Sequence, residues 1–212
     1  MKPIHHHDGI GNFVELGPAK FRMGAAESDR YATAAEGPAR LVEIPYQFAI
    51  GVFPITREQW EFNGEGMLPK VHVSWNDIQT WLSDATGRCA LPLRLPSEAE
   101  WEFAARAGSV GGFPTGDSIT TQEANFLHDD AKNRVGPGHV TPRGTYPPNA
   151  FGLEDMLGNV AEWTADEWAD MRVVRSGGWD ALPRLLRFSA RYPLPPDRRQ
   201  DNLGFRLAYT LT

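Results

Sequence analysis

The chain contains 212 residues, of which 41% are apolar and 23% charged, and its formal net charge is −6. This length suits one large domain or two small ones and can bury a substantial core. The composition excludes an extended disordered chain, and the acidic balance argues against a general nucleic-acid-binding protein.

The residue types also bear on compartment and partners. A single cysteine, Cys89, cannot form a disulfide within the chain. No run reaches the ~18 consecutive apolar residues that a membrane-spanning helix needs, and the N-terminal MKPIHHHDGIGNF lacks the apolar core of a signal peptide. We therefore expect a cytoplasmic protein, with phage association or surface display as alternatives. Its expected partner is a protein or a small molecule, and neither nucleic acid nor a membrane span is expected.

The first quarter of the chain is predicted to form short strands. His5, His6 and His7 lie at its start, and adjacent strand residues point to opposite faces, so at most His5 and His7 could share a metal ion. We expect these histidines to form a solvated terminus. The strand candidates that follow are NFVELG (12–17), FRMG (21–24) and ARLVEIPYQFAIG (39–51).

A helix is predicted after Ser74. This serine and Asp77, three residues later, have the spacing of a capping box, in which each side chain accepts a bond from the other residue's backbone N–H. Thr56 and Gln59 repeat the signal earlier in the chain. The apolar residues after Ser74 follow an i, i+3, i+4, i+7 pattern, which predicts a buried face of Ile78, Trp81, Leu82 and Ala85.

A second helix is predicted after Ser97, whose capping partner is Glu100. Gly108 marks its C-terminal end. The core-facing residues are expected to be Trp101 and the alanines at 104, 105 and 107. Glu98, Glu102 and Arg106 are expected to point outward.

The rest of the chain is predicted to form strands and long connections. The connections 109–124 and 128–149 are rich in Gly, Pro, Asp and Asn and show little periodicity. Loops of this length either fold as ordered excursions or carry function. The last strand candidates are RVVRSGGW (172–179) and GFRLAYTL (204–211). With no internal repeat and no dividing linker, the sequence predicts one α+β domain over residues 1–212, with two main helices around short antiparallel strands and many irregular loops.

Four motifs occur in an order that closely resembles the formylglycine-generating enzyme (sulfatase-modifying factor) family. FRMG, IPYQFAIGVFPITREQW and VHVSWNDIQTWLS also look like the N-terminal half of that family, so the resemblance spans most of the chain. It implies a variant of the C-type-lectin fold. The four motifs are LRLPSEAEWEFAARAG (93–108), PPNAFGLEDMLGNVAEWTADEW (147–168), RVVRSGGW (172–179) and DNLGFRLA (201–208).

The same resemblance argues against oxidase activity. Family members that convert a cysteine to formylglycine place two cysteines after their GGS motif to bind copper, and a thiolate pair suits Cu(I). Here GGWDALPRLLRFSAR (177–191) contains no cysteine, and RSGGW replaces the usual RGGSW. Cys89 lies far from this segment in the sequence. We expect no copper and no formylglycine-generating activity.

Calcium is the cofactor that the resemblance does imply, in a structural role. Hard cations bind several oxygens, and a turn can present carbonyl groups beside a carboxylate. The alternative is that Gly158 and Asn159 only form a turn while Glu162 caps a neighbouring strand. The ligands implied by the family are the carbonyls of Leu157, Gly158 and Val160 with the Glu162 side chain, and at a second site Asn125 with the Phe126 carbonyl. The downstream aspartate of that second site has no clear counterpart around residues 135–138.

Family relatives without catalytic cysteines include the variable proteins of diversity-generating retroelements, which bind ligands through a C-terminal segment rewritten at adenines. Residues 172–208 resemble that segment and are the candidate ligand-binding or variable region. Its apolar residues, if they point outward together, would form the kind of patch that marks a binding site, and the alternative is an ordinary loop core. Arg184, Arg187 and Arg191 are expected to fix the loop through hydrogen bonds. The candidate ligand-binding residues are Asp180, Ala181, Leu182, Arg184, Leu185, Phe188, Tyr192, Leu194 and Arg198.

The sequence thus favours a non-catalytic ligand-binding protein on this scaffold. The alternative is a thiol-independent enzyme of the same family in cofactor, siderophore or other natural-product maturation. Asp166, Glu167 and Asp170 would be available to it as acids or bases, although carboxylates in such a loop are usually solvated. A structural or assembly subunit is the third reading.

Overall fold

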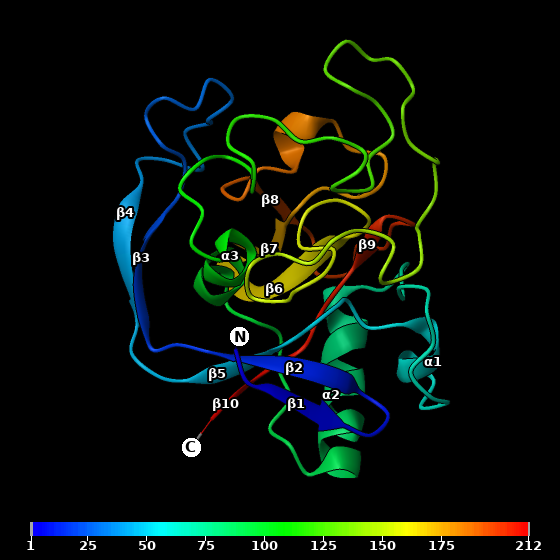
Figure 1. The fold of residues 1–212 in the computed structure, drawn as a ribbon. Helices are drawn as coiled ribbons and strands as arrows, with labels where there is room; N and C mark the ends of the chain where they lie inside the picture. The colour runs from blue at the N-terminus through cyan, green and yellow to red at the C-terminus, as the bar shows by residue number, and fades with distance from the viewer. Residues whose placement is uncertain (1, 212) are drawn as a thin grey trace.

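A computed structural model describes residues 2–211 and shows an α+β architecture in which short strands and irregular loops predominate (Figure 1). The three helices are α1 (Arg57–Trp60), α2 (Trp75–Cys89) and α3 (Glu98–Arg106), and one 3₁₀ turn, η1, spans Pro183–Leu185. The strands are β1 (Ile4–His7), β2 (Gly11–Leu16), β3 (Ala19–Met23), β4 (Arg40–Ile44), β5 (Phe48–Gly51), β6 (Ala161–Trp168), β7 (Met171–Arg175), β8 (Arg191–Leu194), β9 (Leu203–Gly204) and β10 (Ala208–Thr210).

The strands form three small sheets. Their orders are β1-β2-β5-β10, β3-β4 and β8-β7-β6-β9. All pairs are antiparallel except β6 with β9. The C-terminal β10 pairs with β5, so the first and last strands form the two edges of one sheet (Figure 1). None of the helices among residues 2–211 is long and apolar enough to cross a membrane.

Both main helices begin where their capping boxes predict. Ser74 and Asp77 form the reciprocal capping bonds at α2, and Ser97 and Glu100 form them at α3. The third predicted box, at Thr56, caps the four-residue α1. The predicted apolar face of α2 is buried in a core that also contains Trp163 and Phe205, and α3 packs into a second core with Trp101, Ala104 and Ala105.

The outward placement expected for the polar residues of α3 is wrong. Glu98, Glu102 and Arg106 are all buried. The reason is Arg175 at the end of β7, which is fully buried between two of these carboxylates and lies 2.7 Å from Glu98. Arg106 in turn pairs with Glu102 at 2.7 Å. The ion pairs therefore fasten α3 to β7, the strand at the start of the candidate binding segment 172–208.

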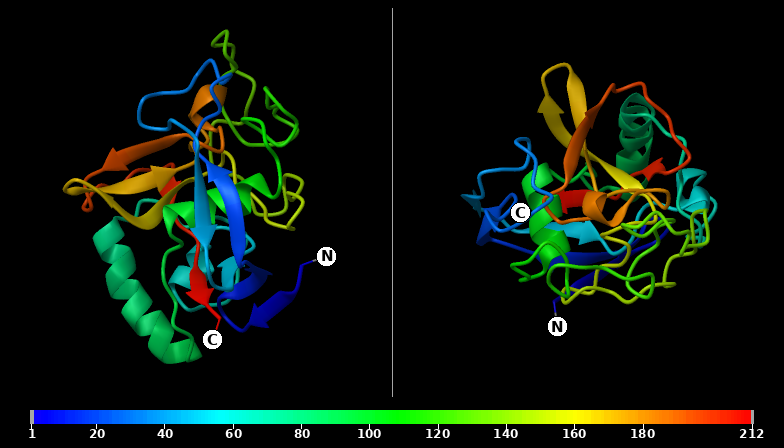
Figure 2. Two further views of the ribbon diagram at one scale, coloured as in Figure 1. Left: turned by 90° about the vertical axis from the view of Figure 1, so that its left-hand side faces the viewer. Right: turned by 90° about the horizontal axis from the view of Figure 1, so that it is seen from above.

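Residues 107–160, between α3 and β6, contain no helix or strand yet are held by specific bonds. Asn149 illustrates this, because its side chain donates to the Ala104 carbonyl of α3 at 2.8 Å and accepts from the Leu153 N–H at 3.1 Å. These loops and η1 lie at the end of the molecule opposite the C-terminal end of α2 (Figures 1 and 2). The long connections of the sequence are thus ordered loops held by hydrogen bonds.

Candidate functional site

The segment between β7 and β8 folds tightly back on itself. Ser176 adopts a positive φ of 60°, and Gly177 and Gly178 are buried. A Cβ atom at Gly177 would lie 2.6 Å from that of Ala181, and one at Gly178 would lie 2.5 Å from that of Asn202. Only glycine fits this close approach. The two glycines therefore fix the path by which the chain enters η1.

Two of the three predicted arginine anchors are confirmed. Arg187 is buried and lies 2.6 Å from Glu36. Arg191 donates to Glu98 at 2.8 Å. Charge-assisted bonds of this kind are short and strong, so they hold the segment against α3 and the loop between β3 and β4. Arg184 is wrong as an anchor: its side chain is exposed and has no hydrogen-bond partner among residues 2–211.

The expected outward patch of apolar residues is also wrong. Phe188 is fully buried, with its ring 5.3 Å from the Arg106 guanidinium. Tyr192 and Leu194 on β8 are half-buried and pack against the core beneath α2. Of the predicted apolar residues, only Leu185 is largely exposed, at 42%. The loop-core alternative therefore holds for Phe188.

The remaining predicted residues lie at the surface around η1 and after β8. Asp180, Arg184 and Arg198 are exposed, whereas Ala181 and Leu182 are half-buried. Asp180 accepts a bond of 2.6 Å from the Asn202 side chain. Burial, and to a smaller extent the Asp180 charge, raises the pKa of Tyr192, so this phenol stays protonated. The segment thus presents Asp180, Arg184 and Leu185 rather than a continuous apolar face.

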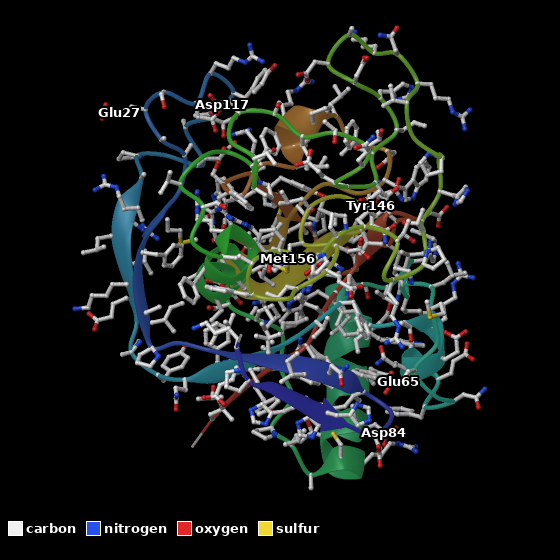
Figure 3. All side chains as sticks on the ribbon, in the orientation of Figure 1. Glu27, Glu65, Asp84, Asp117, Tyr146 and Met156 are labelled. Atoms are coloured by element: carbon white, nitrogen blue, oxygen red, sulfur yellow. The ribbon has the colours of Figure 1, made fainter. Side chains whose placement is uncertain are left out.

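A hollow beside η1 was not foreseen from the sequence. It consists of two adjoining cavities of about 400 and 290 Å³ that share Arg30, Tyr31, Phe113 and Asp117, and we call it the crown hollow. Asp117 lies on the loop after α3, in the upper part of Figure 3. The larger cavity is also lined by Pro183, Ile119 and Val135, and the smaller by Arg187 and Ser189. The one sign of this hollow in the sequence was the length of the connections 109–124 and 128–149, because residues of these loops line much of it.

The larger cavity of the crown hollow combines apolar side chains with mostly acidic charged ones. Asp117, Asp129 and Asp130 line its larger cavity. The Tyr31 hydroxyl donates to Asp130 at 3.1 Å, and hydrogen bonds from Asn133 lower the pKa of Asp129. The Arg30 guanidinium lies over the Tyr31 ring. In the larger cavity three carboxylates face one guanidinium, which suits an apolar ligand group that carries positive charge, whereas the smaller cavity adds Asp29, Arg106 and Arg187.

The geometry around Glu162 does not fit the implied calcium ligand set. Its two carboxylate oxygens accept bonds of 2.7 and 2.8 Å from Arg206, and one also accepts the Trp101 indole N–H at 2.7 Å. A carboxylate already neutralised by a guanidinium has little to offer Ca²⁺. Gly158 and Asn159 both adopt positive φ angles and form a turn. These angles suit a turn, which the calcium hypothesis also requires, and Glu162 forms an ion pair with Arg206 rather than the strand cap of the alternative.

Asn125 fits a cation better than Glu162 does. Its side chain is fully buried, and Nδ2 donates to the His139 carbonyl at 2.9 Å and to Asn159 Oδ1 at 3.1 Å. Its Oδ1 accepts no hydrogen bond within residues 2–211. A buried oxygen without a donor is costly unless an ion or water satisfies it. The neighbouring Phe126 carbonyl lies close against Gly136, so it is partly covered.

The histidines and the thiol lie elsewhere and are not combined into a metal site. Among residues 2–211, no three His, Cys, Asp or Glu side chains are placed to hold a metal ion. His5 binds Glu15 and His7 binds the Tyr209 hydroxyl. Cys89, whose Sγ contacts the Ala85 carbonyl, lies at the C-terminal end of α2, opposite η1 (Figures 1 and 2).

Comparisons with a family model and with a curated relative both match the sulfatase-modifying factor type of domain. Residues 61–211 match the sulfatase-modifying factor enzyme 1-like domain. The chain is 30% identical over 274 residues to inactive C-alpha-formylglycine-generating enzyme 2 of Bos taurus, covering 93% of this chain and 87% of that protein.

Two solved structures are similar over nearly the whole chain. PvdO from Pseudomonas aeruginosa superposes with a TM-score of 0.88 at 26% identity, covering 99% of this chain and 98% of PvdO. Variable protein 1 of Treponema denticola superposes with a TM-score of 0.79 at 19% identity, covering 100% and 99%. The second similarity shows the fold alone.

Proposed function

The chain belongs to the family of sulfatase-modifying factor enzyme 1-like domains, and from this premise we propose that it is a non-catalytic ligand-binding protein. Its fold is the predicted C-type-lectin-like fold of formylglycine-generating enzymes. The chain has one cysteine, Cys89, and its bovine relative carries the name of an inactive enzyme. Both facts support a scaffold that has lost thiol-dependent oxidation and kept recognition.

The observation that carries this proposal is the content of residues 175–191. Leu186 and Phe188 fill the interior of this segment, and arginines clamp it to its surroundings. A copper site for oxygen chemistry needs a pair of soft sulfur ligands, and the described part of the segment has none. A clamped turn whose Pro183 lines the crown hollow suits binding instead. The proposed ligand is a protein or small molecule that places an apolar, positively charged group in the larger cavity of the crown hollow.

The specific form of the proposal is a variable protein of a diversity-generating retroelement. It is supported by the framework positions Trp179, Pro183 and Arg187, between which Asp180 and Leu185 are exposed or partly exposed and could change without disturbing the core. Sequencing the genomic neighbourhood tests this form. A reverse-transcriptase gene beside a near-copy of the 172–208 coding segment, differing only at adenines, is the expected finding. A locus without such a copy would contradict it.

The calcium proposal is narrowed to Asn125 and the Phe126 carbonyl. The orphaned Asn125 Oδ1 supports it, because this oxygen is buried without a donor. When bound there, calcium would fasten the loop that carries Phe126 to the Asn159 turn through Asn125. Its role would be structural.

Matched surface variants test the binding proposal. A peptide display library is selected on the purified chain, and the affinity of an enriched peptide is measured by calorimetry. Val135→Asp is expected to weaken that affinity at least about tenfold, because Val135 is 44% exposed and lines the larger cavity of the crown hollow, and a contact residue at the centre of an interface has an effect of this order. Met67→Asp is the control, because Met67 is 51% exposed and does not line the crown hollow. Equal loss in both variants, or no selected binder, would contradict the proposal.

A second candidate function is a thiol-independent enzyme in cofactor, siderophore or other natural-product maturation. One observation favours it: the Ser189 hydroxyl, at the wall of the smaller cavity, donates to Glu36 at 3.0 Å. However, Glu36 also pairs with Arg187 at 2.6 Å, and a nearby guanidinium weakens a carboxylate as a base. Turnover of a small substrate that is lost in Ser189→Ala, with unchanged unfolding, would favour the enzyme.

A further inference from the structure

The hairpin of β3 and β4 stands apart from the other two sheets at one side of the molecule (Figures 1 and 2). Within residues 2–211 each of the two strands pairs only with the other. Alternate residues on the free side of each strand therefore carry backbone N–H and C=O groups without a strand partner. Such an edge is a template on which another extended chain can pair.

A cavity of about 770 Å³ borders β3, and we call it the edge groove. Lys20 and Arg22 line it from one face of the strand and Phe21 from the other. Since side chains of both faces of β3 border the same cavity, we place the cavity at the strand edge, and Pro38 and Ala39, which precede β4, also line it. Its far wall contains Phe103 of α3, whose ring lies 5.5 Å from that of Phe21, and Val110, which is 90% exposed.

The strand edge carries positive charge. Lys20 and Arg22 are exposed on one face of β3, against a single carboxylate in the lining, Glu27, on the loop that follows β3 (Figure 3). Lys20 pairs across the hairpin with Glu43 at 3.1 Å. Arg22 lies opposite Leu41 and has no acidic partner among the described residues. One cation of the edge is thus available to an incoming chain.

We infer that β3 accepts an extended acidic peptide of a partner protein as an added strand in the edge groove. In strand addition the backbone bonds give affinity and alternating side chains give specificity. Residues opposite Lys20 and Arg22 would be acidic, because oppositely charged cross-strand pairs are favourable. The residue between them would be apolar and would lie against Phe103 and Val110. This inference does not depend on the crown hollow.

A peptide series tests the inference on the full chain. A fluorescent peptide of alternating Glu and Val is titrated in low salt, beside its Lys/Val counterpart and a version with alternate backbone nitrogens methylated. The Glu/Val peptide is expected to bind, the Lys/Val peptide to bind at least tenfold more weakly, and the methylated peptide to lose binding, since methylation removes the strand hydrogen bonds.

Exposed variants separate binding from folding. Arg22→Glu is expected to weaken binding of the Glu/Val peptide about tenfold and to strengthen binding of the Lys/Val peptide. Val110→Asp is expected to weaken binding of the Glu/Val peptide, while Arg57→Glu, at an exposed arginine of α1 outside the groove, leaves it unchanged. Equal affinity for both peptides, insensitivity to methylation, or equal effects of Arg22→Glu and Arg57→Glu would each overturn the inference. None of these outcomes affects the Val135 test of the crown hollow.

Discussion

Glu162 and Arg206 form a two-pronged ion pair in which both side chains are fully buried. Their atoms lie 2.7 and 2.8 Å apart, and Arg206 also donates to the Gly51 carbonyl at 3.0 Å. Glu162 belongs to β6, Arg206 to the chain entering β10, and Gly51 to β5. The pair therefore connects the sheet beneath the candidate site to the sheet that holds both ends of the chain. Its position explains why the GNVAEW and GFR motifs occur together.

Removing one partner of this pair should be strongly destabilising. Arg206→Met leaves the Glu162 carboxylate buried without its cation, and such a loss costs about 3–5 kcal/mol of unfolding free energy. Urea denaturation of the variant measures it. Arg199→Met is the control, because the Arg199 side chain is 45% exposed and pairs with Asp77 at the surface; its loss should stay below about 1 kcal/mol. Similar losses in the two variants would contradict the structural account.

Leu185 and Phe188, three positions apart in the binding segment, should differ sharply in their contribution to stability. Phe188→Ala removes a fully buried ring and should cost about 3–5 kcal/mol. Leu185→Ala changes a mostly exposed side chain and should stay within about 0.5 kcal/mol. Thermal and urea unfolding of both variants provide the comparison. A large loss of stability in Leu185→Ala would mean that the Leu185 side chain is buried, contrary to its exposed position on η1.

Local signals in the sequence predicted the helices correctly. The capping serines at 74 and 97 and the apolar face of α2 depend only on residues within a few positions, so they can be read directly. The motif resemblance similarly predicted the fold. These parts of the structure needed no knowledge of distant contacts.

The errors arose where distant residues decide the outcome. Glu98 and Glu102 look like solvent-facing residues of an amphipathic helix, and nothing near them indicates that Arg175, more than seventy positions later, lies between them. Phe188 and Leu185 are both apolar, and the direction of η1 alone decides which one is buried. The crown hollow is built from loops whose sequences show no periodicity, so its lining could not be assembled from the sequence.

Calcium should stabilise the chain through Asn125 rather than through Glu162. If calcium binds the orphaned Oδ1, addition at about 100 times the dissociation constant should raise the unfolding free energy by about 2.7 kcal/mol. Calorimetry with and without calcium measures this, with magnesium as the control ion. Asn125→Ala should remove the calcium response, whereas Glu162→Gln should keep it at a lower baseline stability. A calcium response retained in Asn125→Ala and lost in Glu162→Gln would restore the ligand set that contains Glu162.

Asp155 should make stability fall as the pH rises towards neutrality. Burial raises the pKa of Asp155 to about 7, although a hydrogen bond from Asn159 and the Arg206 charge act in the opposite direction. In the unfolded chain an aspartate titrates near ~3.9. Between these values the folded state binds the extra proton, so the stabilisation is complete below ~3.9 and is lost as the pH rises through 7.

The isosteric variant isolates this carboxyl. Asp155→Asn keeps a neutral side chain, offers an oxygen to the Asn159 amide, and suits the positive φ of 52° at this position. Urea unfolding at pH 5 and pH 8 should show the wild-type chain losing on the order of 2 kcal/mol more than the variant. Because the Asp77 carboxyl has a pKa lowered to about 2 by Arg199, its titration falls outside this interval. Parallel pH profiles for wild type and variant would show that Asp155 is ionised throughout, and the buried polar network around Asn159 would then need a compensating cation.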